Sequence, residues 1–173
     1  MLKGLENQAY LIPYIISNIV ALVLLYCSSL WPRVSRLIFL LLFGWAGWTN
    51  WTTAMSTPQV YEDYANLAFL DLYTDFIRGW FSGHIVEVVG LIAIGQVLIA
   101  LAMALKGWAF KAGAIGAIIF LVGIGPLGVG SAFPCTLIMA IAMGMLLPNT
   151  KGYLWEVKPV HHEVNRSYPW RIN

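Results

Sequence analysis

Long, nearly uninterrupted apolar runs constrain this chain more than any other feature. About 20 predominantly apolar residues are enough for an α-helix to cross the hydrocarbon core of a bilayer, and several such runs occur in its 173 residues. Only 10% of the residues are charged and the mean hydropathy is +0.75, whereas soluble domains carry about 25% charged residues. The sequence therefore predicts an all-α, polytopic membrane helix bundle over residues 1–148, with a polar tail at 149–173.

Several classes of function find no support in the sequence. The net charge of +2 and the lack of a basic aromatic patch argue against a nucleic-acid partner. Phosphate-binding loops, dinucleotide fingerprints and nucleophile elbows are absent, so we lean against an enzyme. We predict no metal site, because the two cysteines lie singly in apolar runs and other ligands are too few.

Five membrane spans are favoured. They are expected at about residues 9–30, 37–55, 84–105, 107–125 and 131–147. The last two share one apolar stretch that would be roughly 54 Å long as a single helix, against a hydrocarbon core of roughly 30 Å. A Gly-Pro-rich segment at 125–131 divides it, with Ser131 expected as an N-cap and Pro134 in the next first turn. The alternative is four spans, with one broken or re-entrant helix around 125–131.

The connection at about residues 60–82 predicts one amphipathic helix that lies on the membrane surface or caps the bundle. One face gathers polar residues at helical spacing, and the other gathers large apolar side chains. The polar face holds Asp71, Thr74, Asp75, Arg78 and Ser82. The apolar face holds Phe69, Leu72, Tyr73, Phe76, Ile77 and Trp80.

The distribution of charge predicts the orientation. Two short connections, at 31–36 and 106–111, hold basic residues and no acid, and such loops face the cytoplasm. The long connection is mainly acidic and is expected outside. We therefore predict a bacterial inner-membrane protein with an external N-terminus and a cytoplasmic tail. Cys27 and Cys135 should then lie at opposite ends and cannot form a disulfide.

A candidate polar cluster surrounds the start of the third span. His84 and Glu87 are three residues apart and point the same way, and ionisable groups in a span suggest function. Asp71, Asp75 and Arg78 would join them if the amphipathic helix folds over this end. The alternative is a solvated face with local ion pairs.

Three tryptophans follow the second span at a spacing of three residues. Trp45, Trp48 and Trp51 would form an aromatic surface for a quinone, pigment or lipid, or would simply pack against other helices. We expect no bound cofactor, with a quinone or a lipid as the possible exceptions. Asn18, Asn50 and Gln96 are expected to form hydrogen bonds between helices.

From residue 36 to 148 the chain resembles the DoxX-like family of small four-helix membrane proteins. Arg36 opens an apolar helix that ends in Gly44-Trp45-Ala46-Gly47, and Glu87 precedes a Gly-rich run, Gly90 to Gly95. A pair of short Gly/Ala-rich helices follows. The turn Lys106-Gly107-Trp108 departs from the Thr-Arg pair of the family, and the first span is an addition. Of possible site residues, the resemblance carries over Glu87 alone.

The resemblance implies a link to redox membrane complexes, such as a thiosulfate:quinone oxidoreductase, or a role in assembly. The leading interpretation is a non-catalytic membrane subunit or accessory protein of a larger complex. Its partners would be the lipid bilayer and other membrane subunits or copies of itself. The alternatives are a small transporter or channel with a polar site at the outer face, and a quinone-binding oxidoreductase component.

Cysteine accessibility in intact cells tests the predicted topology. Single cysteines at Arg33, Ala109 and Asn165 should react only after the membrane is permeabilised, because these positions are expected in the cytoplasm. A cysteine at Asp63 should react from outside. External labelling at Asn165 would contradict five spans and restore one broken helix.

Overall fold

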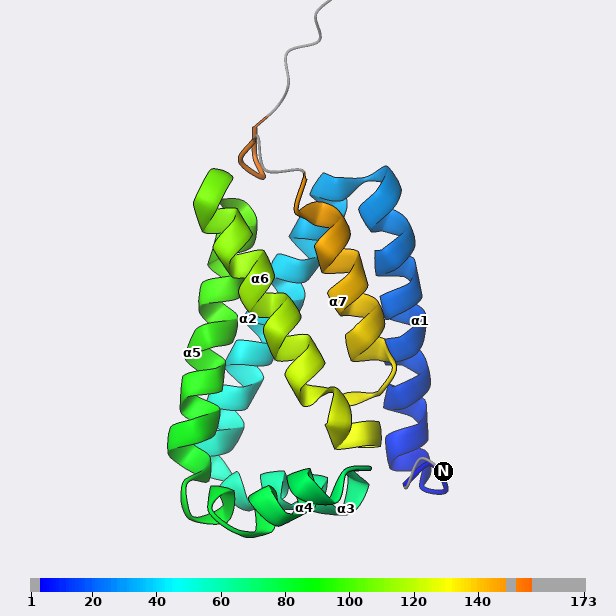
Figure 1. Cartoon of the computed structure of the whole chain (residues 1–173), viewed down its shortest axis with the longest axis vertical. Helices are drawn as coiled ribbons and strands as arrows, with labels where there is room; N and C mark the ends of the chain where they lie inside the picture. Colours follow the sequence, from blue (N-terminus) through cyan, green and yellow to red (C-terminus); the bar gives the residue numbers. More distant parts are fainter. Residues whose placement is uncertain (1–3, 149–151, 157–173) are drawn as a thin grey trace, which may run out of the picture.

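The computed structural model describes residues 4–148 and 152–156. Five helices run along its long axis (Figure 1): α1 (Gln8–Leu30), α2 (Pro32–Ser56), α5 (Ile85–Ala104), α6 (Gly107–Ile124) and α7 (Cys135–Leu146). Every regular element within the described ranges is helical. Helices α1 and α5, and α6 together with the turn that follows it, are long and apolar enough to cross a membrane. The chain is a helical membrane protein.

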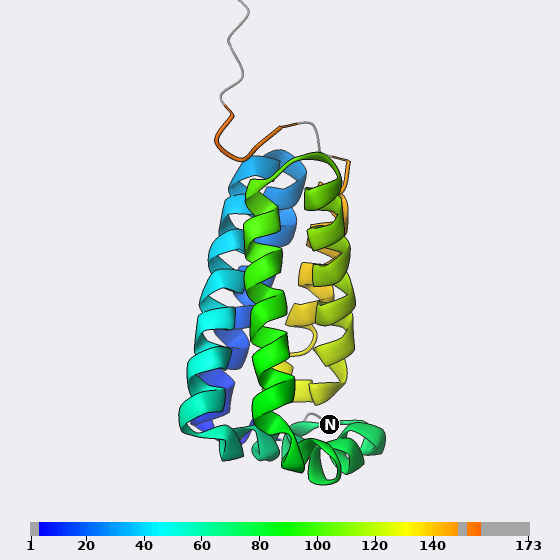
Figure 2. The same cartoon turned by 90° about the vertical axis from the view of Figure 1, so that its left-hand side faces the viewer.

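The two ends of the bundle differ in charge. The α1–α2 and α5–α6 connections and the end of α7 meet at one end, here called the basic end, with Arg33, Lys106 and Lys111 (Figure 1). The opposite, acidic end is covered by short elements that lie across the bundle (Figure 2). They are η1 (Pro58–Asp63), α3 (Tyr64–Leu67), α4 (Asp71–Arg78) and η2 (Phe81–Gly83). Together they form the acidic cap.

The second helix begins five residues earlier than expected. Pro32 occupies its first turn, where a missing N–H removes no hydrogen bond. Ser35 N–H donates to the Trp31 carbonyl at 3.1 Å. The predicted basic turn at 31–36 is thus almost entirely helical, because proline starts the helix here.

The predicted amphipathic helix is in the expected place but is not one helix. Its chain leaves the helical path after Leu67, where Ala68 is extended, and Phe69 N–H donates to the Pro126 carbonyl at 3.2 Å. The expected faces also hold only in part: Ile77 is buried, whereas Leu72 on the same predicted face is 74% exposed. Contact with the turn after α6 interrupts the helix and decides which side chains are covered.

The Gly-Pro-rich segment forms a 3-10 turn, η3 (Gly125–Ser131), beside the acidic cap. Gly128 has φ +66°, and an added Cβ would lie 2.5 Å from the Leu67 carbonyl oxygen, so glycine is required. The chain reverses here, and α6 and α7 run side by side in opposite directions (Figure 1). The alternative in which one broken helix continues in the same direction beyond residues 125–131 is therefore wrong.

Helix α7 is shorter than the predicted span at 131–147. Ser131 does not cap it, because its hydroxyl donates to the carbonyls of Gly125 and Gly128 at 3.3 and 3.1 Å. Ala132 then adopts a left-handed conformation with φ 53°, and Pro134 takes the N-cap position. The 12 residues of α7 cover about 18 Å at 1.5 Å per residue, which is less than the roughly 30 Å of a hydrocarbon core.

Cys27 and Cys135 are both buried and free. Cys27 lies three residues before the end of α1, at the basic end, whereas Cys135 is the first residue of α7 near the opposite end. This arrangement confirms the prediction that no disulfide joins them.

A buried arginine closes the basic end. Arg36 is 3% exposed, and its Nε donates to the Met103 carbonyl at 2.9 Å while Nη2 donates to the Leu105 carbonyl. Nη1 donates to the Gly152 carbonyl at 2.9 Å, and the guanidinium lies 4.3 Å from the centre of the Phe110 ring. Arg36 therefore satisfies carbonyls at the end of α5, which have no partner within the helix, and binds the tail to the bundle.

Arg36→Leu should lower the free energy of unfolding in detergent by about 2–4 kcal/mol, because three carbonyls lose a charged donor. Proteolysis after Gly152 should also become faster. Arg33→Leu is the matched control: Arg33 is exposed, and a change within about 0.5 kcal/mol is expected. Equal effects of the two substitutions would show that charge, and not the bonds of Arg36, supports this end.

Candidate functional site: a tyrosine pocket beneath the acidic cap

A partly open cavity of about 440 Å³ lies at the acidic end, between α1, α2, the cap and η3. We call it the tyrosine pocket. Its volume falls within the range of small-molecule sites, about 300–1,000 Å³. Its polar lining combines phenols, hydroxyls, an amide and one carboxylate: Tyr10, Tyr14, Ser17, Thr49, Asn50, Thr53, Tyr61, Asp63 and Tyr64. Ala9, Pro13, Val60, Leu67, Val129 and Ala132 contribute the apolar part.

Two stacked tyrosines from the cap form one wall. The rings of Tyr61 and Tyr64 are 6.0 Å apart with an angle of 17° between their planes. Burial raises the pKa of both phenols, and the proximity of Tyr64 raises that of Tyr61 further. Both therefore stay neutral at physiological pH and act as hydrogen-bond donors or acceptors toward a guest.

A chain of side-chain hydrogen bonds leads from this wall into the bundle. Tyr61 donates to Asn50 Oδ1 at 2.9 Å, and Asn50 Nδ2 donates to Gln96 Oε1 at 2.8 Å. The chain joins the cap to α2 and α5, and it fixes the orientation of both amides. Asn18 on α1 separately donates to the Ala132 carbonyl at 3.0 Å. The prediction of hydrogen bonds between helices is confirmed for Asn50 and Gln96, whereas Asn18 bonds to the segment between η3 and α7.

The predicted polar cluster is not assembled by direct bonds. Glu87 is exposed, and no hydrogen bond or salt bridge within the described part of the chain joins it to His84, Asp71 or Asp75. His84 Nδ1 lies 2.8 Å from the Trp80 carbonyl oxygen, and its ring stacks on the indole at 4.3 Å.

Within the described ranges, the charged side chains of the predicted cluster in the cap do not bond to one another. Arg78 donates to Asn66 Oδ1 at 2.9 Å, and Asp71 and Asp75 are exposed. Helix α5 turns Glu87 outward, so its carboxylate is exposed and not enclosed by the bundle. Any functional role of the five residues stays a prediction.

The three tryptophans face outward. Trp45 and Trp48 are each 68% exposed and Trp51 is 43% exposed, and none of them lines the tyrosine pocket. Of the two expectations, packing between helices is therefore wrong for Trp45 and Trp48. The aromatic surface for a quinone, pigment or lipid stays a prediction.

Comparisons of the chain with protein-family models, with curated proteins and with solved structures found no match. The resemblance to the DoxX-like family therefore stays a prediction.

The sequence contains a signal for the pocket. Tyr61 and Tyr64 stand three residues apart in the acidic connection, shortly after Thr57-Pro58. Asn50 and Thr53 have the same spacing near the end of the second span. Two polar pairs that flank one turn are brought together when the chain reverses there, whereas the contribution of Tyr10 and Tyr14 depends on the position of α1.

Alkaline pH should destabilise the folded protein through the pocket tyrosines. Their pKa values are raised in the folded state, so the folded state holds these protons above about pH 10, where free tyrosine loses them. The stability present below that pH is lost as the pH rises through the folded-state pKa.

Thermal unfolding in detergent, measured across this range, should show a decline that becomes smaller in the double variant Tyr61→Phe/Tyr64→Phe. A decline of equal size in the wild type and the double variant would contradict the assignment.

Proposed function

We propose that this chain is a non-catalytic integral membrane subunit or accessory protein of a larger, redox-linked membrane complex, and that it binds an amphipathic quinone or lipid in the tyrosine pocket. The observation that carries the proposal is the pocket itself. It combines oriented, neutral hydrogen-bonding groups with apolar walls in a helical membrane protein.

The chemistry of the lining favours an amphipathic guest with an uncharged, oxygen-bearing head. The half-buried phenols of Tyr61 and Tyr64 and the amide of Asn50 offer donors and acceptors without formal charge. Small-molecule sites commonly pair apolar walls with a few fixed polar groups of this kind. The tail of such a guest would lie along the apolar part of the lining, toward Pro13 and Ala132.

The role within a complex is supported by the two different ends of the bundle and by the resemblance. The described tail residues fold back on the basic end: Leu154 N–H donates to the Ala104 carbonyl at 3.1 Å, and Lys106 lies 4.5 Å from the centre of the Tyr153 ring. Trp155 is left 66% exposed beside them. This docked segment offers a partner protein an ordered aromatic and basic surface. The transporter alternative has less support, because His84 and Glu87 do not line the pocket.

The proposal includes five spans, an external N-terminus and a cytoplasmic tail in the bacterial inner membrane. Successive long helices run in opposite directions along one axis, which supports it (Figure 2). These helices are α1, α2, α5, α6 and α7. The gathering of Arg33, Lys106 and Lys111 at the end expected in the cytoplasm also supports the proposal.

Purification from native membranes in mild detergent tests both parts of the proposal. Wild-type protein should retain a stoichiometric partner protein, identified by mass spectrometry, and a bound quinone or lipid, identified after solvent extraction. Thr53→Leu should reduce the bound molecule at least about tenfold, because the larger side chain fills the pocket at a lining position.

Thr52→Leu is the matched control. Thr52 is adjacent on α2, does not line the pocket and bonds only to carbonyls of its own helix, Trp48 and Thr49. It should retain both the partner and the bound molecule. An isolated homo-oligomer with no other protein would contradict the subunit role, and equal retention in both variants would contradict the pocket assignment.

A further inference from the structure

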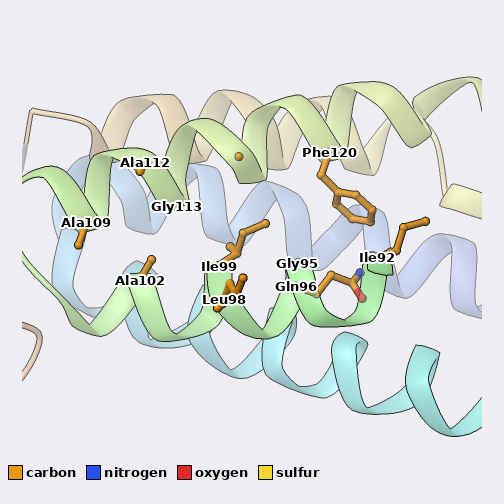
Figure 3. Close-up of a pocket in the computed structure, with 11 residues that line it drawn as sticks. Ile92, Gly95, Gln96, Leu98, Ile99, Ala102, Ala109, Ala112, Gly113 and Phe120 are labelled. Atoms are coloured by element: carbon orange, nitrogen blue, oxygen red, sulfur yellow. The ribbon is translucent and has the colours of Figure 1, made fainter. Parts of the chain in front are cut away.

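A second cavity lies between α5 and α6, away from the tyrosine pocket. It is an elongated groove of about 500 Å³ on the outer face of two helices that are long and apolar enough to cross a membrane. Its walls consist mainly of small side chains, which leave the space open (Figure 3). The lining residues are Gly95, Ala102, Ala109, Ala112, Gly113 and Gly116, with Ile92, Leu98, Ile99 and Phe120 as the larger members.

The groove contains one polar side chain, Gln96, which is 4% exposed. Its Oε1 accepts a hydrogen bond from Asn50 and so is directed toward α2. Its Nε2 donates no hydrogen bond to any residue in the described ranges, and the amide points into the space between α5 and α6 (Figure 3). A buried amide donor is therefore directed into an apolar groove.

The hydrogen-bond chain explains why the amide keeps this orientation. Tyr61 donates to Asn50 Oδ1, which leaves the Asn50 amide nitrogen to donate to Gln96 Oε1. Rotating the Gln96 amide by half a turn would place two donors against each other. The Nε2 donor is thus held toward the groove by bonds that begin in the cap.

An amide donor in the middle of a spanning helix requires an acceptor. Gln96 is the twelfth of the 20 residues of α5, so it lies near mid-membrane, where water is scarce and an unsatisfied polar group costs several kcal/mol. Lipid tails offer no acceptor at that depth. A guest that satisfies this donor must carry an acceptor oxygen on an otherwise apolar body.

We propose that the α5–α6 groove is a binding site for a neutral, membrane-soluble carbonyl compound, of the aryl ketone or quinone class, whose oxygen accepts a hydrogen bond from Gln96 Nε2. This site is distinct from the tyrosine pocket, and occupancy of the pocket is not required. The small wall residues admit a flat or slender molecule, and the volume suits a small-molecule site.

Photolabelling of the purified full-length protein tests the site. The probe is a benzophenone with an alkyl tail, which carries the carbonyl and forms covalent bonds to nearby C–H groups on illumination. Mass spectrometry should locate the label on α5 and α6 residues that line the groove. An unlabelled alkyl aryl ketone should compete about five- to tenfold better than the alkylbenzene in which CH2 replaces the carbonyl, which has nearly the same shape without the oxygen.

Two variants test the hydrogen bond of Gln96 and the open volume of the groove separately. Gln96→Leu should abolish the preference for the ketone over the hydrocarbon. Gly95→Leu should reduce labelling at least about tenfold, because the leucine side chain would occupy the groove. An added Cβ at Gly95 meets open space, so the substitution starts without a clash. Gly144→Leu on α7 is the matched control, since its Cβ also meets open space but lies outside the groove, and labelling should be unchanged.

Equal competition by ketone and hydrocarbon, or labelling that persists in Gly95→Leu, would overturn the proposal. If Gln96→Leu fails to fold, the wild-type competition and the Gly95→Leu result still decide it. Label confined to the tyrosine pocket would support the proposed function and overturn this second site. Protection of the groove by a second copy of the chain, seen as crosslinked dimers with no groove labelling, would overturn it as well.

Discussion

Polar groups buried in a membrane must find their partners inside the protein, and this constraint accounts for most of what is irregular in the structure. Regular helices satisfy their own backbones, but the segment around the η3 turn does so only in part. Ser131 donates to carbonyls within η3. Other donors come from outside: the Phe69 N–H donates to the Pro126 carbonyl, the Tyr73 hydroxyl to the Gly123 carbonyl at the end of α6, and Asn18 on α1 to the Ala132 carbonyl. The acidic cap is broken into short pieces because it supplies Phe69 and Tyr73.

The same constraint explains a buried cation at the basic end. Among the residues that the structure describes, Arg36 donates to carbonyl oxygens alone, those at the end of α5 and that of Gly152. Helix C-termini carry a partial negative charge and leave carbonyls unsatisfied, so a guanidinium with several donors suits this position. Arg36 is one of the basic residues on which the predicted orientation rests. The same residue also joins α2, α5 and the tail.

Three polar residues form one connected chain of hydrogen bonds. Tyr61, Asn50 and Gln96 link the tyrosine pocket to the α5–α6 groove through two hydrogen bonds. Because each amide has one donor side and one acceptor side, orienting the first orients the next. The candidate sites thus depend on positions in α2, α5 and the cap that are distant in the sequence.

The sequence by itself determined the helical membrane class, the limits of α1, α5 and α6 to within one or two residues, and the chain break at 125–131, because length, hydropathy and Gly-Pro content act locally. It also indicated that Asn50 and Gln96 bond between helices, since amides in apolar helices need partners.

Only the tertiary structure decided which residues meet. It turned Glu87, Trp45 and Trp48 outward, buried Arg36, shortened α7 and divided the predicted helix at 60–82. The physical reason is that burial and hydrogen-bond partners depend on how α1, the cap and η3 pack together, and no local pattern of residues specifies that packing.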